Sequence, residues 1–213
     1  MMGGMDAGRS GAPIGYAREL PRLLWGASMR LFTAIDLPPA IVESLERLIR
    51  TLRPTARIHW SRADNLHITT KFIGEWPEQR LDEVGKALAG LPPRDPLRIE
   101  VRGLGWFPNP RSPRVFWAGV EAPAALAGLA RDTEAALEPL GIAREERAYS
   151  PHLTLARIKT PVPLDPLRQA LDRLGPGGFG AFTADSFFLY RSELRPGGSI
   201  YTKLARYGLG RGA

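Results

Sequence analysis

Residues 65–74, NLHITTKFIG, and residues 149–158, YSPHLTLARI, decide the fold of this chain. Each places apolar residues at every second position around a histidine, which predicts a β-strand. Both contain the pattern His-x-Thr, built on His67 in the first stretch and on His152 in the second. The two histidines lie 85 positions apart, and this spacing suggests that one structural unit is present twice.

A second match supports the duplication. Residues 31–34, LFTA, resemble residues 115–118, VFWA, which lie 84 positions later. Between each of these strands and its His-x-Thr strand, apolar residues recur at helical spacing, over residues 40–52 in the first copy and 122–140 in the second. We therefore predict two strand-helix-strand units, each ending in one His-x-Thr.

Strand geometry gives the repeat a chemical meaning. Side chains at positions i and i+2 of a strand point to the same face, so each histidine projects together with the threonine that follows it. The residues between them, Ile68 and Leu153, are expected to face the buried side. If the two units pack about a pseudo-twofold axis, one cleft receives two imidazoles and two hydroxyls.

A single His-x-Thr is common in strands and is more often structural than catalytic. Two copies at matching places in a repeat favour a functional site. The chain has only three histidines, and the third, His59, has no counterpart in the other unit. We interpret His59, next to Trp60, as structural or substrate-lining.

The remaining pattern alternates irregularly between strands and helices. A strong turn at residues 195–198, RPGG, joins two strands near the end of the chain. We predict an α+β fold of two lobes, built from duplicated strand-helix-strand units with mostly antiparallel sheets around a central groove. Further strands are expected at residues 30–36, 58–60, 97–101, 114–120, 182–190 and 200–207, and further helices at residues 78–91 and 164–174.

The composition is that of a globular protein of 213 residues with a net charge of +7. The basic residues are 25 Arg and only 4 Lys. The planar guanidinium matches phosphate oxygens, which is compatible with an RNA partner, although a GC-rich genome produces the same bias. The absence of cysteine excludes disulfides, thiolate metal sites and a cysteine nucleophile.

The ends of the domain follow from composition. Residues 1–28 are rich in Gly and small residues, so we predict a disordered N-terminal extension followed by a single domain over residues 29–213. The apolar patch at residues 20–25 is too short for a secretory signal, and no apolar run reaches the length of a membrane span. We expect a cytoplasmic protein with no membrane association.

At these residues the chain resembles the two-histidine phosphoesterases, and among them the bacterial and archaeal RNA 2′,3′-cyclic phosphodiesterases, once named 2′-5′ RNA ligases. The resemblance runs from Met29 to Tyr207, and it departs from the family pattern at Thr70, where an apolar residue is usual. The matching text is MRLFTAID at residues 29–36, NLHITTKFIGE at 65–75, VFWAG at 115–119, PHLTLAR at 151–157 and the segment 190–201.

The resemblance implies opening of 2′,3′-cyclic phosphate ends of RNA to a 2′-phosphate, with neither a metal nor an organic cofactor. It implies His67 as the proton donor and His152 as the proton acceptor. Some relatives join tRNA halves through a 2′-5′ linkage, so reversible ligation is a further expectation. We expect a monomer that needs no obligate protein partner.

Residue types around the motifs suggest further roles. Thr69 and Thr154 can donate hydrogen bonds to phosphoryl oxygens as charge develops there. The resemblance makes Arg157 a substrate-binding candidate, although simple alternation places it on the opposite face from His152 unless a bulge intervenes. Phe72 and Tyr149 are candidates for stacking on a base, since single-stranded RNA is often held in this way.

Three alternatives remain open at this point. The same apparatus would serve a phosphodiesterase of a small cyclic nucleotide or cyclic phosphate. A non-catalytic RNA-binding protein would need phosphate donors but not two titratable groups. A metallohydrolase is the weakest alternative, since three histidines and no close ligand cluster leave little to hold an ion.

Overall fold

A computed structural model describes residues 27–175, 177–196 and 198–210. Most of the predicted extension therefore lies outside the described residues, while Ser28 is already the first residue of strand β1. The strands are β1 Ser28–Asp36, β2 His59–Trp60, β3 His67–Pro77, β4 Leu97–Phe107, β5 Val115–Glu121, β6 His152–Arg157, β7 Gly178–Ala184, β8 Ser186–Arg195 and β9 Gly198–Gly208. The α-helices are α1 Pro39–Leu52, α2 Leu81–Ala89, α3 Ala124–Leu137 and α4 Asp165–Leu174.

The described strands form two sheets, and all their pairings are antiparallel. One sheet, here the first sheet, has the order β3-β1-β8-β9. The second sheet has the order β2-β6-β5-β4-β7. The series β3-β1-β8-β9 corresponds to β6-β5-β4-β7, so the duplication extends to strands that are distant in sequence. The predicted α+β fold with duplicated units is confirmed.

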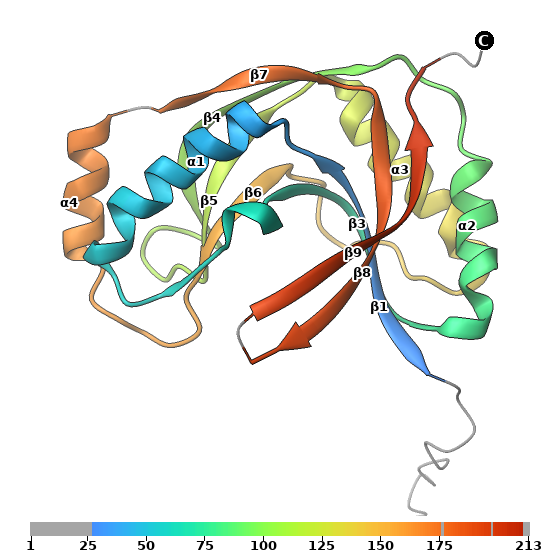
Figure 1. Ribbon diagram of the computed structural model, residues 1–213, viewed down its shortest axis with the longest axis horizontal. Helices are drawn as coiled ribbons and strands as arrows, with labels where there is room; N and C mark the ends of the chain where they lie inside the picture. Colours follow the sequence, from blue (N-terminus) through green and yellow to red (C-terminus); the bar gives the residue numbers. More distant parts are fainter. Residues whose placement is uncertain (1–26, 176, 197, 211–213) are drawn as a thin grey trace, which may run out of the picture.

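The helices of the two units are exchanged between the sheets. Helix α1 follows the first strand of the first sheet but packs against β7 of the second sheet, whereas α3 packs against β3 of the first. Figure 1 shows α1 and α4 beside the strands of the second sheet, with α2 and α3 on the other side of the molecule. No helix in the described part of the chain is both long and apolar enough to span a membrane.

A glycine lies at the contact between α1 and β7. Gly180 has a φ of +119°, and a Cβ at this position would lie 2.7 Å from Cδ1 of Ile41. A side chain at Gly180 would therefore be strained by the positive φ and would displace the end of the Ile41 side chain. The glycine thus permits the close contact between the helix of one unit and the sheet of the other.

One hydrophobic core runs through both sheets. It contains the fully buried Ile68 of β3 and Leu153 of β6, the residues between His and Thr in the two motifs. Full burial of such a side chain is worth about 1.5–3 kcal/mol. The predicted orientation of both motif strands is therefore confirmed, with the central residue inward and the His-Thr pair outward.

The predicted single strand over residues 182–190 is wrong. The chain changes sheet at Asp185, so that β7 pairs with β4 in the second sheet and β8 pairs with β1 in the first. The backbone carbonyl of Asp185 accepts a hydrogen bond from the backbone N–H of Leu209 at 2.6 Å. The polar residues Asp185 and Ser186 mark the place of this change in the sequence, but the prediction ran one strand across them because the residues on both sides are suited to a strand.

The predicted match between the two first strands is wrong by one residue. The positions opposite the two motif histidines are Asp36 in β1 and Gly119 in β5, which are 83 positions apart. Phe32 consequently lies on the same side of its sheet as the motif histidine, whereas Phe116 lies in the main core. A shift of one residue turns a strand over, and similarity of letters alone did not reveal it.

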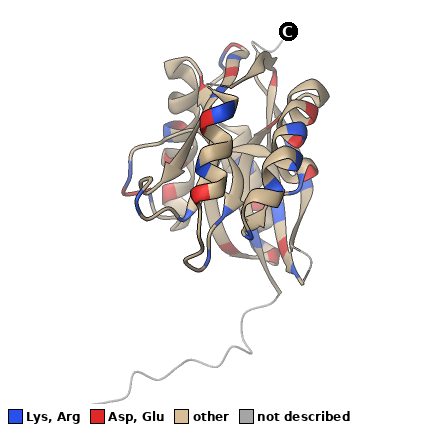
Figure 2. Cartoon of the chain, turned by 90° about the vertical axis from the view of Figure 1, so that its left-hand side faces the viewer, with Lys and Arg blue, Asp and Glu red and all other residues tan. Residues whose placement is uncertain are grey.

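Charged residues do not divide the molecule into a basic and an acidic face. Figure 2 shows Lys and Arg interspersed with Asp and Glu over the helices and strand ends. The net charge of +7 therefore does not locate an RNA site by itself. Locating such a site requires the individual contacts around the two motifs.

Candidate active site

The two motifs begin two strands that contact each other. His67 is the first residue of β3 and His152 is the first residue of β6, and the two strands pack together. Both histidines and the threonines that follow them are half-buried. We call the side of each sheet that carries these four side chains, His67, Thr69, His152 and Thr154, the motif face.

Both imidazoles are oriented by the backbone in the same way. Nδ1 of His67 lies 2.8 Å from the carbonyl oxygen of Asn65, and Nδ1 of His152 lies 2.8 Å from the carbonyl oxygen of Ser150. A carbonyl oxygen only accepts hydrogen bonds, so Nδ1 of each ring carries the hydrogen. The Nε2 atom of each ring is therefore available to accept a proton when the ring is neutral, or to donate one when it is charged.

A bulge in β6 brings a guanidinium to the motif face. Trp117 pairs with Thr154 and Phe116 pairs with Ala156, so Leu155 has no partner in β5. Leu155 and Ala156 are both buried, which interrupts the alternation. Arg157 then returns to the side of Thr154. The expectation from simple alternation, that Arg157 faces away, is wrong, and the bulge is the physical reason.

The same bulge occurs at the equivalent place in β3. Ala34 pairs with Thr69 and Thr33 pairs with Lys71, so Thr70 is the residue without a partner. Thr70 and Lys71 are both buried. Phe72, which follows them, occupies the place that Arg157 has in β6, and its side chain is 57% exposed. We call each motif, together with the residues around it, a half-site. The half-site of β3 therefore offers an aromatic ring at this place, and the half-site of β6 offers a guanidinium.

Burial and charge act together on the two histidines. Burial lowers the pKa of His67, and the positive charges of Arg157 and His152 lower it further. Burial also lowers the pKa of His152, followed by the charge of Arg157. Hydrogen bonds to the backbone carbonyls oppose these effects in both rings, and the carboxylate of Asp36 opposes them at His67 alone. Two imidazoles and one guanidinium thus share an electrostatic environment.

The groups that could hold phosphoryl oxygens are unengaged. Within the described ranges, the hydroxyls of Thr69 and Thr154 make no hydrogen bond to the protein, and no carboxylate pairs with Arg157. The described residues contain no group of three or more His, Cys, Asp or Glu placed to bind a metal ion. The available donors are therefore hydroxyls and a guanidinium.

Aromatic rings that the sequence did not single out surround the two histidines. Phe32 lies 4.8 Å from the His67 ring, and Tyr201 meets the same ring edge-on at 5.2 Å, between centroids. Phe107 meets the His152 ring edge-on at 4.9 Å. These rings limit the rotation of each imidazole. Their positions depend on strands β1, β9 and β4, which no local motif connects to the histidines.

The third histidine lies beside the guanidinium. His59 in β2 pairs with Arg157 in β6 and is exposed. Residues paired across antiparallel strands point to the same side, so His59 faces the same way as Arg157. Trp60 points inward, and its indole N–H donates to the carbonyl of Ala56 at 3.1 Å. Of the two readings of His59, a substrate-lining position is favoured.

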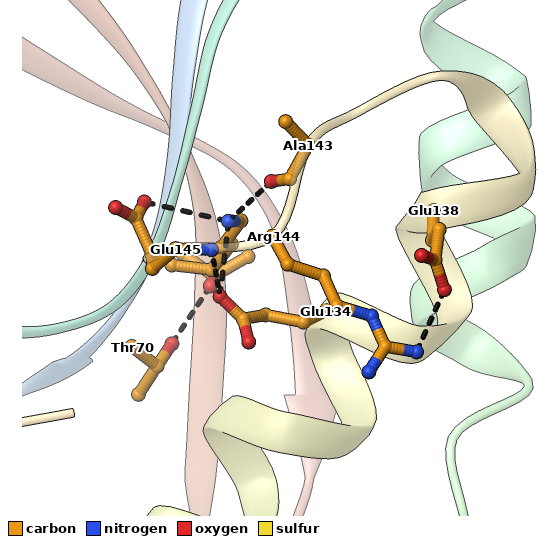
Figure 3. A network of polar contacts seen from close by, with 8 residues as sticks. Thr70, Glu134, Glu138, Ala143, Arg144 and Glu145 are labelled. Atoms are coloured by element: carbon orange, nitrogen blue, oxygen red, sulfur yellow. Dashed lines mark hydrogen bonds and ion pairs between the residues drawn. The ribbon is translucent and has the colours of Figure 1, made fainter. Parts of the chain in front are cut away.

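A buried lysine, Lys71, connects the first motif strand to the segment that leads into the second. Figure 3 shows its partners Glu134, Ala143 and Glu145. Lys71 Nζ lies 3.1 Å from a carboxylate oxygen of Glu134 in α3, and it donates to the carbonyl of Ala143 at 2.8 Å and to Glu145 at 3.3 Å. Burial would raise the pKa of Glu134, but hydrogen bonds from the Glu145 backbone N–H and from Lys71 outweigh it and lower this pKa. The carboxylate therefore stays charged and holds the lysine.

Tyr149 makes a second connection of the same kind. Its hydroxyl donates to the backbone carbonyl of Thr69 at 2.9 Å, and burial raises its pKa, so the hydroxyl keeps its proton. The ring packs against the main core. These contacts favour a structural tie between the half-sites and give no support to the predicted stacking role.

Replacing Tyr149 by phenylalanine is expected to lower the free energy of unfolding by about 1 kcal/mol, since the carbonyl of Thr69 loses a hydrogen bond. Urea unfolding followed by circular dichroism measures this loss. Tyr207→Phe is the matched control, because its hydroxyl lies 3.5 Å from its acceptor, the carbonyl of Gly85. Equal losses in the two variants would contradict the role given to Tyr149.

Comparison with known proteins places the chain in a family. The family model described as LigT like phosphoesterase matches residues 35–117 and again residues 119–201, once for each unit. An RNA 2′,3′-cyclic phosphodiesterase of Methanothermobacter thermautotrophicus is 36% identical over 178 residues, which cover 83% of this chain and 96% of the relative. A protein of the same name from Thermus thermophilus is 36% identical over 190 residues, covering 85% and 90%.

Solved structures show the same architecture. TT0787 of Thermus thermophilus superimposes with a TM-score of 0.73 at 34% identity, covering 86% of this chain and all of that one. E. coli LigT in complex with 3′-AMP gives a TM-score of 0.70 at 28% identity, covering 87% of this chain and all of LigT.

Proposed function

Because the chain belongs to the LigT-like phosphoesterase family, we propose that it is an RNA 2′,3′-cyclic phosphodiesterase that converts a terminal cyclic phosphate to a 2′-phosphate. The observation that carries the proposal is the pair of imidazoles on adjoining strands, each with Nδ1 held by a carbonyl and Nε2 left for chemistry. The relatives named above carry this activity in their names.

The proposed reaction is an in-line displacement at phosphorus. His152 accepts a proton from water as the water oxygen attacks, and the bond between phosphorus and the 3′ oxygen breaks. His67 gives its Nε2 proton to that departing oxygen. Proton transfers of this kind are each worth about 10²–10⁴ in rate. The step consumes one water and leaves the phosphate on the 2′ oxygen.

The other motif-face residues are assigned to the phosphate and the base. The hydroxyls of Thr69 and Thr154 donate to the non-bridging oxygens as charge develops on them. Arg157 supplies a charge-assisted hydrogen bond to the same phosphate. The exposed ring of Phe72 is suited to stacking on the terminal base.

We also propose that the protein acts in the cytoplasm as a monomer without an obligate partner, over a single domain of residues 29–213. Both half-sites come from one chain, so the scheme requires no second copy. Ligation of tRNA halves is the reverse of ring opening on the same atoms and remains a secondary proposal.

An RNA oligomer that ends in a 2′,3′-cyclic phosphate tests the function. Incubated with the protein in the presence of EDTA, it is expected to yield a 2′-phosphate end at an undiminished rate, because protein groups perform every proton transfer. Loss of activity in EDTA, or a 3′-phosphate product, would contradict the proposal.

Faster turnover of a 2′,3′-cyclic mononucleotide than of the oligomer would favour the small-substrate alternative, and binding without turnover would favour the RNA-binding alternative.

A further inference from the structure

The two half-sites differ at the residue opposite the histidine. In the first sheet, Asp36 of β1 pairs with His67 of β3. In the second sheet, Gly119 of β5 occupies the equivalent place and pairs with His152 of β6. Side chains paired in this way have Cβ atoms about 4.5–5.5 Å apart. A carboxylate therefore accompanies one histidine and not the other.

The second half-site has no room for a matching carboxylate. A Cβ at Gly119 would lie 2.5 Å from the backbone oxygen of Arg102 and 3.4 Å from the Trp117 ring. The backbone oxygen cannot move aside as a flexible side chain would. The asymmetry is thus built into the pairing of β4 with β5.

Asp36 is itself held in place by two partners. The hydroxyl of Tyr190 in β8 donates to one carboxylate oxygen, and Lys203 in β9 forms an ion pair with the other. Burial and the carboxylate both raise the pKa of Tyr190, so its hydroxyl remains a donor. The side chain of Asp36 is 31% exposed, which leaves it able to act on its neighbour.

The surroundings of His67 include charges of both signs. Asp36 comes from β1, Lys203 from β9, and Arg157 from β6. The remaining neighbours that titrate are the hydroxyls of Tyr190 and Tyr201 and the ring of His152. Only Asp36 among these favours a charged imidazole at His67. Among the described residues, no carboxylate acts on His152, and its pKa is set by burial, the carbonyl of Ser150 and the charge of Arg157.

We propose that Asp36 is a positioning residue that makes the near-symmetric site directional. The reaction needs one charged and one neutral imidazole, and Asp36 favours the charged form at His67, which leaves the neutral His152 as the base. The inference rests on the proposed function, because the two roles have meaning only for a proton-transfer reaction. It gives a physical basis to an assignment that otherwise depends on resemblance alone.

The assignment also accounts for the protons through one turnover. Water loses a proton to Nε2 of His152, and Nε2 of His67 loses one to the 3′ oxygen. The product complex therefore has a charged His152 and a neutral His67, the reverse of the starting state. Exchange with solvent must remove it from His152 and return one to His67, and the carboxylate of Asp36 favours that final distribution.

Titration of the histidine side chains by NMR tests the proposal on the free protein. The chain has three histidines, so three imidazole signals are expected, assigned by single His→Ala variants. In the natural protein, His67 should keep its proton to higher pH than His152. Asp36→Asn should move the His67 titration to lower pH, and Lys203→Met, which leaves the carboxylate less neutralised, should move it to higher pH. Neither change should move His152 as far.

The pH dependence of turnover gives an independent readout. In Asp36→Asn, the alkaline limb of the profile should shift to lower pH, with a several-fold loss of kcat at the alkaline end and an unchanged acidic limb. Asp82→Asn removes an exposed carboxylate of helix α2 and serves as the control for charge. The opposite shift expected for Lys203→Met keeps the test valid if Asp36→Asn folds poorly.

The proposal is overturned if Asp36→Asn and Lys203→Met leave the His67 titration in place, or if His152 holds its proton to higher pH in the natural protein. A protein that shows the expected titrations but does not open cyclic phosphates would instead refute the proposed function. The two failures are therefore distinguishable.

Discussion

Replacing either His67 or His152 by alanine is expected to lower the turnover of a cyclic-phosphate RNA by about 10²- to 10⁴-fold, because each variant loses one of the two proton transfers. Both side chains lie on the motif face outside the main core, so circular dichroism and thermal unfolding should remain close to those of the natural protein. The double variant should lose less than the product of the two single losses, since residues that act as a unit are not additive.

A substrate with a good leaving group separates the two roles. A phosphodiester that releases p-nitrophenolate needs no proton on the departing oxygen, so His67→Ala should recover much of its activity on it while His152→Ala does not. His59→Ala removes the third imidazole, which takes no part in either proton transfer, so its turnover is expected within an order of magnitude of the natural protein. Recovery by His152→Ala instead would reverse the assignment of acid and base, and normal turnover by both variants would refute the mechanism.

The sequence was sufficient for the parts of the site that follow strand alternation. Ile68 and Leu153 are buried where the spacing predicts, and the His-Thr pairs face outward. These positions follow from a local rule that holds along any regular strand. The repeat of one motif also predicted that two such strands lie together.

The parts that failed depend on interruptions of that rule. The unpaired residues Thr70 and Leu155 reverse the faces of Phe72 and Arg157, yet nothing in the text TTKF or TLAR marks a bulge. Both bulges leave two adjacent residues buried, and this becomes visible only once the partner strand is known. The match of LFTA in β1 with VFWA in β5 was wrong by one residue for a related reason. A strand with apolar side chains on both faces has no clear register in its sequence.

Duplication supplies a symmetric scaffold, and single residues then remove the symmetry. The repeated bulge sets Phe72 in one half-site against Arg157 in the other, and the repeated first strand sets Asp36 against Gly119. A reaction with one entering and one departing oxygen requires groups of unequal kind on its two sides. The backbone repeats, and the side chains at these positions differ in the way the chemistry requires.

Replacing Arg157 by alanine is expected to lower kcat/KM by about 10- to 100-fold, the value of a charge-assisted hydrogen bond of about 1.5–3 kcal/mol. The charge of Arg157 lowers the pKa of both histidines, so its removal raises both. The acidic and alkaline limbs of the pH profile should therefore move together to higher pH. This differs from Asp36→Asn, which should move one limb in the opposite direction.

Two controls isolate the contribution of position from that of charge. Arg47→Ala removes an exposed guanidinium from helix α1, whose buried residues pack into the main core, and should leave both limbs and kcat/KM unchanged. Arg157→Lys keeps the charge but loses the paired N–H donors of the planar guanidinium, so it should restore the pH profile while recovering only part of kcat/KM.

If Arg157→Ala shifts neither limb, the guanidinium does not face the histidines, and the bulge at Leu155 has no catalytic consequence. A shift without a loss of kcat/KM would leave Arg157 as an electrostatic neighbour of the imidazoles that makes no contact with the phosphate.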